Sequence, residues 1–238
     1  IDPYFNKEWS SEMDKKTGEN GVREFLRIYY ANVKLIDDQV GRILQSLEKK
    51  GVYDETIIIF TSDHGDMTGS HGMLWKSTSA FYNEVVKVPL IIRFPQKIKP
   101  GSFKVPVSLV DIMPTLLEFT GNAVPASCQG KSLFNLVTGK EKEKNHYPYA
   151  FCERMTANPG NVRQMIENPK GSYMIMSKTS KYIEYADGTC FYYDLKNDPG
   201  ETHNEYENPK YLKKIKTLKF EMEKWHLKTR QTVITENR

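Results

Sequence analysis

The stretch TIIIF at residues 56–60, followed at once by TSDHGD at residues 61–66, decides the fold. Its first half is continuously apolar and mostly β-branched, which is typical of a strand buried on both faces, as in a parallel sheet covered by helices. Its polar second half stands at the carboxyl end of that strand, where ligands gather in open α/β sheets. The sequence therefore predicts an α/β fold with a candidate site directly after residue 60.

Helical and strand-like patterns surround this strand. Apolar residues recur at threes and fours over residues 22–50, which predicts a long amphipathic helix ending at Gly51. Residues 1–20 have no clear period, and we expect a loop there. A second buried strand is expected at residues 88–94, and a further helix at residues 108–121.

After the charged stretch at residues 140–145 the sequence changes to short aromatic segments, and we interpret this stretch as a boundary. Four short aromatic strands are predicted after it, at residues 147–153, 173–177, 181–185 and 190–195. The last two flank an Ala-Asp-Gly hairpin turn at residues 186–188. An amphipathic helix closes the chain, with one apolar face made of Tyr211, Ile215, Leu218, Met222 and Trp225. We expect two parts, residues 1–140 with the α/β pattern and residues 141–238 with a small α+β pattern.

The composition excludes several classes of protein. With 238 residues, 39% hydrophobic and 27% charged, the chain has ordinary globular values. A net charge of +4 without a Lys/Arg stripe argues against a nucleic-acid partner. No apolar run approaches the roughly 18 residues that a membrane span needs. Three widely spaced cysteines, Cys128, Cys152 and Cys190, leave one disulfide with a spare thiol open, but we expect three unpaired side chains.

The segment after the first strand carries the chemistry. Asp63 and His64 can offer a carboxylate oxygen and an imidazole nitrogen to one cation, and Gly65 permits the sharp exit that such crowding requires. From these residues alone, an ordinary turn in which Asp63 caps the next segment is an equally good interpretation.

Seven further motifs follow along the chain. They are GSHGMLWK at 69–76, FYNE at 81–84, VPLIIRFP at 88–95, VSLVDIMPTLL at 107–117, GKSL at 130–133, YDL at 193–195 and DPGETHN at 198–204. Together with TSDHG they resemble the sulfatases of the alkaline phosphatase superfamily, from about residue 29 onward. The resemblance implies the C-terminal part of an alkaline-phosphatase-like fold: a layered sheet with flanking helices, present in part, followed by a small antiparallel sheet plus helix. Residues 1–140 would then belong to the catalytic domain and residues 141–238 to a C-terminal subdomain.

The same resemblance assigns roles. Asp63 and His64 match a pair of ligands to a divalent cation, usually Ca²⁺. Lys76 matches the lysine that contacts the sulfate ester, where an ammonium offsets charge growing on the sulfate oxygens. His71 is the second catalytic candidate; hydrogen bonding to the leaving group, general-acid catalysis and stabilisation of the loop all remain open for it. Three further residues are interpreted as supporting structure: Asp66, Glu84 and Arg93.

Part of the sulfatase pattern is missing. Sulfatases use C/S-x-P-x-R, whose first residue becomes a formylglycine, and none of the three cysteines fits this motif. No counterpart of the family's N-terminal aspartate pair precedes residue 22. Two ligands cannot enclose a Ca²⁺ ion, which prefers six to eight oxygens. We therefore expect the formylglycine upstream of this chain, and we expect the chain alone to be inactive. The missing half can be explained by a proteolytic or cloned fragment.

The resulting hypothesis is a sulfatase that hydrolyses sulfate esters of small molecules or glycans. A phosphonate or phosphodiester hydrolase of the same superfamily is the first alternative, and a non-catalytic binding or assembly fragment is the second. Without its flanking strands, the buried strand would expose apolar surface, so we expect the missing N-terminal half or self-association as a partner. The family implies a periplasmic, lysosomal or secreted location, although no signal peptide is visible.

Overall fold

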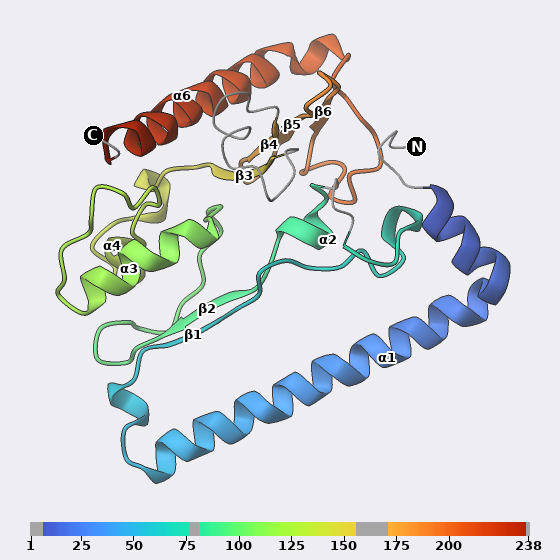
Figure 1. The fold of residues 1–238 in the computed structure, drawn as a ribbon. Coiled ribbons are helices and arrows are strands. Elements are labelled where there is room, and N and C mark those ends of the chain that lie inside the picture. The colour runs from blue at the N-terminus through green and yellow to red at the C-terminus, as the bar shows by residue number, and fades with distance from the viewer. Residues whose placement is uncertain (1–6, 77–80, 156–170, 237–238) are drawn as a thin grey trace. The chain divides into compact units, whose positions relative to one another are not determined.

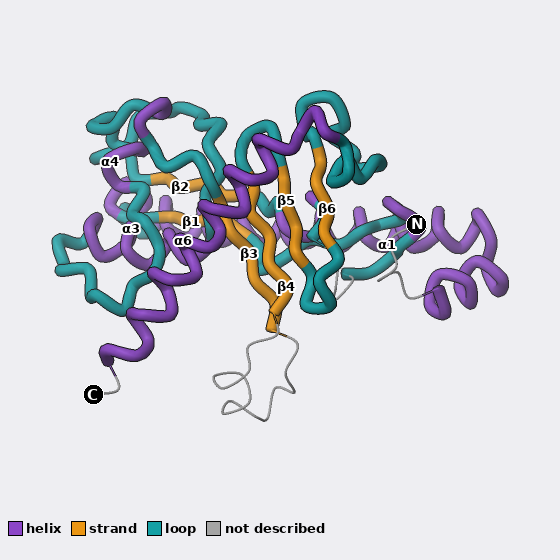
Figure 2. The backbone as a smooth tube through the Cα atoms, turned by 90° about the horizontal axis from the view of Figure 1, so that it is seen from above, coloured by secondary structure: helices purple, strands orange, loops and turns teal. Residues whose placement is uncertain are grey.

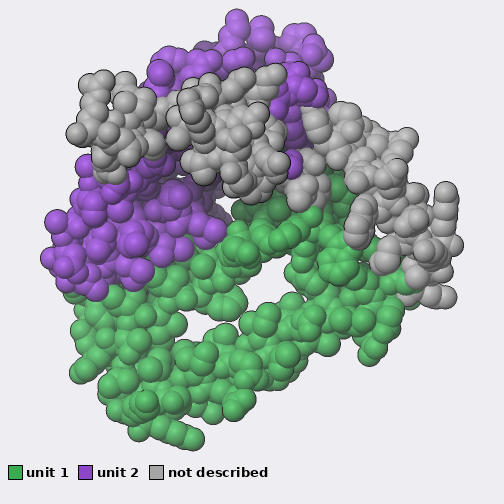
Figure 3. Space-filling model, viewed as in Figure 1, with its two compact units in different colours: residues 1–98 green, residues 99–238 purple. Residues whose placement is uncertain are grey.

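The structure, a computed structural model, describes residues 7–76, 81–155 and 171–236. It divides into two compact units, residues 1–98 and residues 99–238 (Figure 3). The predicted boundary near residue 140 concerns the domains of the complete protein and stays a prediction.

The first unit is built on one long helix and one two-stranded ribbon (Figure 1). Its elements are α1 (Lys7–Lys49), η1 (Tyr53–Glu55), β1 (Ile58–Thr61), η2 (Ser70–Gly72), α2 (Asn83–Val86) and β2 (Leu90–Arg93). Helix α1 has 43 residues and is therefore about 65 Å long at 1.5 Å per residue. The predicted helix is confirmed, but the predicted loop is wrong from residue 7 onward. Glutamate, lysine and methionine favour a helix there without an apolar period.

Helix α1 ends at the predicted glycine. Gly51 has a φ of +71°, its amide donates to the carbonyl of Glu48 at 2.9 Å, and the amide of Val52 donates to Leu47 at 3.1 Å. This left-handed cap satisfies carbonyls that the end of the helix leaves without a helical partner.

Strands β1 and β2 pair with each other in antiparallel register, from Ile58 opposite Arg93 to Thr61 opposite Leu90. The prediction that the first strand is buried on both faces, as in a parallel sheet, is therefore wrong for the described residues. The Phe60 side chain is 37% exposed and that of Ile91 60%. A ribbon of two strands has no further layer to cover both of its faces.

Helix α1 also exposes much of its apolar stripe in the described part of the chain. Tyr30 is 67% exposed, Ile43 61% and Ile36 54%. Contiguous exposed apolar surface of this kind marks a face that other protein covers. The expected partner, a further part of the protein or a second copy, stays a prediction.

The second unit begins with short helices: η3 (Leu109–Asp111), α3 (Ile112–Phe119), α4 (Phe134–Val137) and η4 (Glu143–Asn145). The predicted helix at residues 108–121 is confirmed. Its start is a capping box, in which Asp111 accepts the Ser108 amide at 2.8 Å. The other carboxylate oxygen of Asp111 accepts the Lys131 amide at 2.7 Å. This buried carboxylate thus ties the 130–133 segment to the start of the helix.

A four-stranded antiparallel sheet, ordered β3-β4-β5-β6, follows in the second unit. Its strands are β3 (Ala150–Met155), β4 (Gly171–Met176), β5 (Lys181–Glu184) and β6 (Cys190–Tyr193). They correspond to the four predicted strands. The predicted hairpin turn between the last two is confirmed: Gly188 has a φ of +89°, and the Asp187 carboxylate accepts the Thr189 amide at 2.9 Å.

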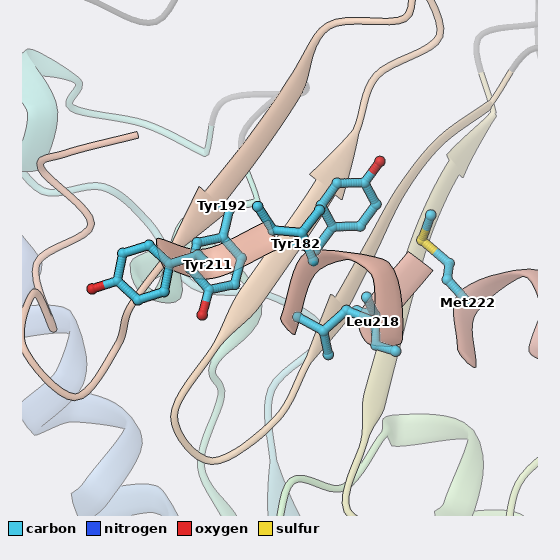
Figure 4. Close-up of a cluster of buried hydrophobic side chains, with 7 residues drawn as sticks. Tyr182, Tyr192, Tyr211, Leu218 and Met222 are labelled. Atoms are coloured by element: carbon cyan, nitrogen blue, oxygen red, sulfur yellow. The ribbon is translucent and has the colours of Figure 1, made fainter. Parts of the chain in front are cut away.

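Helix α6 (Leu212–Glu236), preceded by η5 (Pro209–Tyr211), lies across one face of this sheet (Figures 1 and 2). The predicted apolar face is confirmed. Tyr182 and Tyr192 of the sheet pack against Tyr211, Leu218 and Met222 (Figure 4). One turn further along, the Trp225 ring stacks on the Phe151 ring, with centroids 4.8 Å apart. These side chains form an apolar cluster between the sheet and α6.

The cysteine side chains and the lengths of the helices are both defined in the described residues. The three cysteines are unpaired, as expected. None of the helices in residues 7–76, 81–155 and 171–236 is long and apolar enough to cross a membrane.

Candidate active site at the end of strand β1

Asp63 stands two residues after the last residue of β1, with its side chain 84% exposed. One carboxylate oxygen, Oδ1, accepts the backbone amide of His64 at 2.9 Å. This hydrogen bond holds the pKa of the Asp63 carboxyl below its usual range. The other oxygen, Oδ2, lies 3.5 Å from His64 Nε2. Asp63 is therefore an ionised carboxylate that presents one free oxygen beside the imidazole.

The tautomer of His64 follows from its two neighbours. Its Nδ1 lies 2.9 Å from the carbonyl oxygen of Gly65, which can only accept, so Nδ1 carries the proton. Its Nε2 lies 3.0 Å from Nζ of Lys76, which can only donate. The Nε2 lone pair therefore points to the side where the Asp63 oxygen and the Lys76 ammonium lie. A backbone carbonyl that fixes the proton on one nitrogen leaves the other free to ligate a metal.

Lys76 reaches this point because its own backbone is anchored. The Asp66 carboxylate accepts the Lys76 amide at 2.7 Å, across ten residues of chain. Asp66 thus sets the position of the lysine, in agreement with its interpretation as supporting structure. The intervening loop is closed by two backbone bonds, from Thr68 to Leu74 at 3.0 Å and from Gly69 to Met73 at 2.7 Å.

The loop that follows β1 and carries Asp63, His64 and Lys76 is called the site loop, and Gly65 lies where it meets α2. Its amide donates to the Val85 carbonyl at 2.8 Å. A Cβ at this position would lie 1.9 Å from the carbonyl oxygen of Glu84. Glycine is therefore required here by close approach, and Glu84 contributes through its backbone.

His71 does not join the group formed by Asp63, His64 and Lys76. Its ring stacks on the Tyr82 ring, with centroids 3.8 Å apart and planes 16° apart. Its backbone has a φ of +52°, a left-handed conformation that costs a non-glycine residue free energy. In the described part of the chain, no hydrogen bond or ion pair connects it to the other three residues.

Arg93 also stands apart from the site. Its guanidinium donates to the Tyr53 carbonyl at 2.9 Å and to the Asp54 carboxylate at 2.5 Å. It also lies over the Tyr53 ring, 3.6 Å from the centroid. These contacts join β2 to the turn after α1, as expected of a supporting residue.

The donors fit a divalent cation in part. Asp63 offers a charged oxygen and His64 a neutral nitrogen lone pair, both on one side of the loop. Within the described residues, no group of three or more His, Cys, Asp or Glu side chains could hold a metal. Two protein donors fall short of the six to eight oxygens that Ca²⁺ takes. These residues therefore suit part of a cation site whose remaining ligands come from elsewhere.

An ammonium beside a carboxylate and an imidazole lone pair, at the end of a strand, suits an anionic ligand. Comparison with known proteins identifies the class. The sequence model of the Sulfatase family matches residues 2–122, and that of the N-sulphoglucosamine sulphohydrolase C-terminal region matches residues 69–228. The chain belongs to the sulfatase family.

Individual relatives agree with this assignment. The chain is 35% identical over 199 residues to an N-acetylglucosamine-6-O-sulfatase of Bacteroides thetaiotaomicron, covering 82% of this chain and 34% of that protein. A solved structure of a protein with its substrate D-glucosamine-2-N,6-O-disulfate aligns with a TM-score of 0.75 and 30% identity, covering 95% of this chain and 46% of that one. A phosphonate monoester hydrolase of Agrobacterium radiobacter aligns with a TM-score of 0.75 and 28% identity, covering 90% and 43%.

These relatives confirm the predicted fold class, an alkaline-phosphatase-like fold present in part. The chain spans about a third to a half of the length of the proteins it matches. The residue roles implied by the family are therefore proposals for the complete protein.

Proposed function

We propose that the protein hydrolyses a sulfate ester of a sulfated glycan, releasing the alcohol and free sulfate. In this reaction the bond between sulfur and the alcohol oxygen breaks, and an oxygen from water ends on sulfur. The chain would supply Asp63, His64 and Lys76 to the active site. Support comes from the relatives that act on sulfated glucosamine and from the contact of Lys76 with the free face of His64.

Lys76 has the geometry of a sulfate-binding residue. An ammonium has three N–H donors, and the one that His64 Nε2 accepts at 3.0 Å would be released when that nitrogen ligates the cation, because Nε2 has a single lone pair. The remaining donors are available to sulfate oxygens, on which negative charge accumulates as the ester bond breaks. Because the Asp66 carboxylate holds the lysine backbone, the ammonium is positioned before the substrate arrives.

Asp63 and His64 are proposed to hold a divalent cation, Ca²⁺ by the family's habit, with further ligands from outside this chain. When bound, the cation would supply Lewis-acid polarisation of a sulfate oxygen. A formylglycine outside this chain is the expected nucleophile. The chain alone, with two of the cation's ligands and no C/S-x-P-x-R motif, is proposed to be inactive.

His71 is proposed to act through the loop. Its stacking on Tyr82 stabilises the segment that leads to Lys76, and this contact favours a positioning role over proton donation. The variant His71→Phe keeps a ring and should retain most sulfate release, whereas His71→Ala should lose it. Equal losses in both variants, with loss of the alkaline limb of the pH profile, would favour the proton-donor role instead.

Activity is tested on the protein expressed from its complete reading frame. Sulfate released from N,6-O-disulfated glucosamine is measured by ion chromatography, before chelation, after chelation and after Ca²⁺ is restored. The proposal predicts release that is lost on chelation, restored by Ca²⁺ and abolished in Asp63→Ala. Absence of release from any sulfate ester by the metal-loaded protein would refute it.

The similarity to a phosphonate monoester hydrolase favours one second candidate. A phosphonate monoester also presents anionic oxygens to an ammonium and a cation, so the described residues suit both substrates. Parallel assays with 4-nitrophenyl sulfate and 4-nitrophenyl phenylphosphonate separate the two. A larger kcat/KM for the phosphonate would make it the leading function.

A periplasmic, lysosomal or secreted location is proposed from the family alone, and a glycan substrate is in keeping with it. The exposed apolar faces of α1 and of the β1–β2 ribbon are proposed to be covered by further parts of the protein or by a second copy. Size-exclusion chromatography of the isolated 238-residue chain should then show self-association, and a stable monomer would contradict this.

A further inference from the structure

Four lysines gather around an open groove in the second unit, which is lined by none of the residues assigned to catalysis. Lys131, Lys140, Lys142 and Lys144 line it together with the amide side chains of Asn135 and Asn145. Its volume is about 820 Å³, within the range of about 300–1,000 Å³ typical of ligand sites. The charged stretch at residues 140–145, interpreted from the sequence as a boundary, forms one wall of it.

Two of these lysines are held in place. The Lys131 amide is fixed by the buried Asp111 carboxylate at 2.7 Å. The segment is pressed so closely onto η3 that a Cβ at Gly130 would lie 2.1 Å from the Val110 carbonyl oxygen. The Lys131 ammonium lies 5.9 Å from the Tyr147 ring centroid, and that of Lys140 lies 4.9 Å from the Phe134 ring centroid. Contacts with aromatic rings restrain an ammonium without neutralising it.

The acidic residues nearby are already engaged. Glu141, which also lines the groove, accepts from His146 Nδ1 at 3.0 Å, and this hydrogen bond lowers the pKa of its carboxyl. Glu143 accepts the Lys104 amide at 3.0 Å. Among the described residues, no ion pair joins any of the four ammonium groups to a carboxylate. The lining residues include four lysines and one glutamate, Glu141, so together they carry a net charge of 4 − 1 = +3.

We propose that this groove, the lysine groove, binds an anionic segment of a sulfated glycan through residues other than those assigned to cleavage. The lysines meet the sulfate groups, while the amide side chains of Asn135 and Asn145 suit sugar hydroxyls. Among the residues that the structure describes, no arginine lines it for bidentate phosphate recognition and no aromatic ring lines it for base stacking. The choice of a sulfated glycan rests on the proposed function.

The test compares two matched variants of the protein expressed from its complete reading frame. The groove variant is Lys131→Gln/Lys140→Gln/Lys142→Gln/Lys144→Gln. The control variant, Lys178→Gln/Lys196→Gln/Lys213→Gln/Lys216→Gln, removes the same charge from exposed lysines elsewhere on the second unit. Binding is measured by fluorescence anisotropy with a labelled heparin octasaccharide. A hyaluronan octasaccharide, which has carboxylates but no sulfates, and a 12-nucleotide single-stranded DNA serve as comparison probes.

An exposed ion pair contributes a factor of about 2.3 in affinity, so four should contribute about 30-fold. The groove variant should therefore bind the heparin octasaccharide about 30-fold more weakly, with the control variant close to wild type. Equal weakening in both variants, or no weakening in either, would overturn the proposal. DNA binding as tight as heparin binding through the same lysines would overturn the assignment to a sulfated glycan.

Hydrolysis of 4-nitrophenyl sulfate, measured on the same samples, separates this inference from the proposed function. The groove variant should keep wild-type hydrolysis of this small ester, because the groove lies outside the residues assigned to cleavage. Heparin binding that depends on the lysine groove, in a protein that cleaves no sulfate ester, would support the groove while the proposed function failed.

Discussion

Gly65 offers a sharp test of how the site loop is held. In Gly65→Ala the new Cβ would lie 1.9 Å from the Glu84 carbonyl oxygen and 3.1 Å from its carbon. Separations of a Cβ from such an oxygen below 3.0 Å are essentially never seen, so the two segments must move apart by at least 3.0 − 1.9 = 1.1 Å. Both partners are backbone, so no side chain can rotate away to relieve the contact.

The displacement acts directly on the neighbouring residues. Moving Gly65 lengthens its 2.8 Å hydrogen bond to Val85 and shifts the carbonyl that fixes the His64 tautomer. A misplacement of about 1 Å in an active site costs on the order of 10²-fold in rate. Loss of the backbone bond and the remaining strain should lower the free energy of unfolding by about 1–3 kcal/mol.

The assay is kcat/KM for sulfate release by the complete protein, with thermal unfolding recorded on the same samples. Gly41→Ala is the matched control, because the added Cβ has nothing within 4 Å. This helical substitution should stabilise by about 0.5–1 kcal/mol without changing the rate. Wild-type kcat/KM in Gly65→Ala would refute the close-approach reasoning, since no alternative relief of the backbone contact is available.

Three further perturbations test other parts of the account. Lys76→Ala should lower kcat by about 10²–10³-fold. The melting temperature should stay unchanged because the side chain is exposed. An increase in KM with an unchanged kcat would contradict a role in the transition state. The hydrogen bond from His146 lowers the pKa of the Glu141 carboxyl in the folded state. This hydrogen bond therefore contributes its full stabilisation above the unfolded-state pKa of about 4.3, and the stabilisation is lost as the pH falls through the folded-state pKa. In urea titrations across that window Glu141→Gln should therefore lose less stability on acidification than wild type, and parallel curves would contradict this. Ile215 lies on the face of α6 that packs on the sheet, and its side chain is 5% exposed. Ile215→Ala should therefore cost about 2–5 kcal/mol of unfolding free energy. A cost below about 1 kcal/mol would show that the helix packs less tightly than the structure indicates.

The second unit was more predictable than the first, for a physical reason. Its strands alternate with clear turn residues, and the face of α6 from Tyr211 to Trp225 follows a helical period over a sheet that lies next to it in sequence. Local pattern and tertiary packing agree there, so the four strands and α6 could be placed from the sequence alone, whereas the short helices α4 and η4 were not predicted.

In the first unit, the sequence pattern predicts neither the pairing of strand β1 nor the start of helix α1. The apolar run at residues 56–60 indicates a strand but carries no information on its neighbours, and its partner β2 pairs antiparallel. Residues 7–20 continue α1 through helix propensity, without the apolar period by which helices are recognised. The first error comes from inferring burial on both faces of a strand in which Phe60 is 37% exposed, and the second from requiring an apolar period before expecting a helix.

The candidate site was predictable as a set of residues and not as a geometry. The strand-end position of Asp63 and His64 follows from sequence, and Lys76 came from family resemblance alone. The carbonyl that sets the His64 tautomer and the Asp66 anchor of Lys76 depend on the path of the loop. The stacking of His71 on Tyr82 joins residues eleven positions apart and has no sequence signal of its own.

Calcium binding is the direct test of the proposal that Asp63 and His64 hold part of a cation site. Isothermal titration of Ca²⁺ into the metal-free complete protein is compared between wild type and Asp63→Asn, which keeps the shape of the side chain and removes its charge. Because loss of a hydrogen-bonding partner of a metal ligand already costs about 10–100-fold in affinity, loss of the ligand's charge should cost at least about 100-fold. The account predicts that weakening; an unchanged affinity in Asp63→Asn would contradict it.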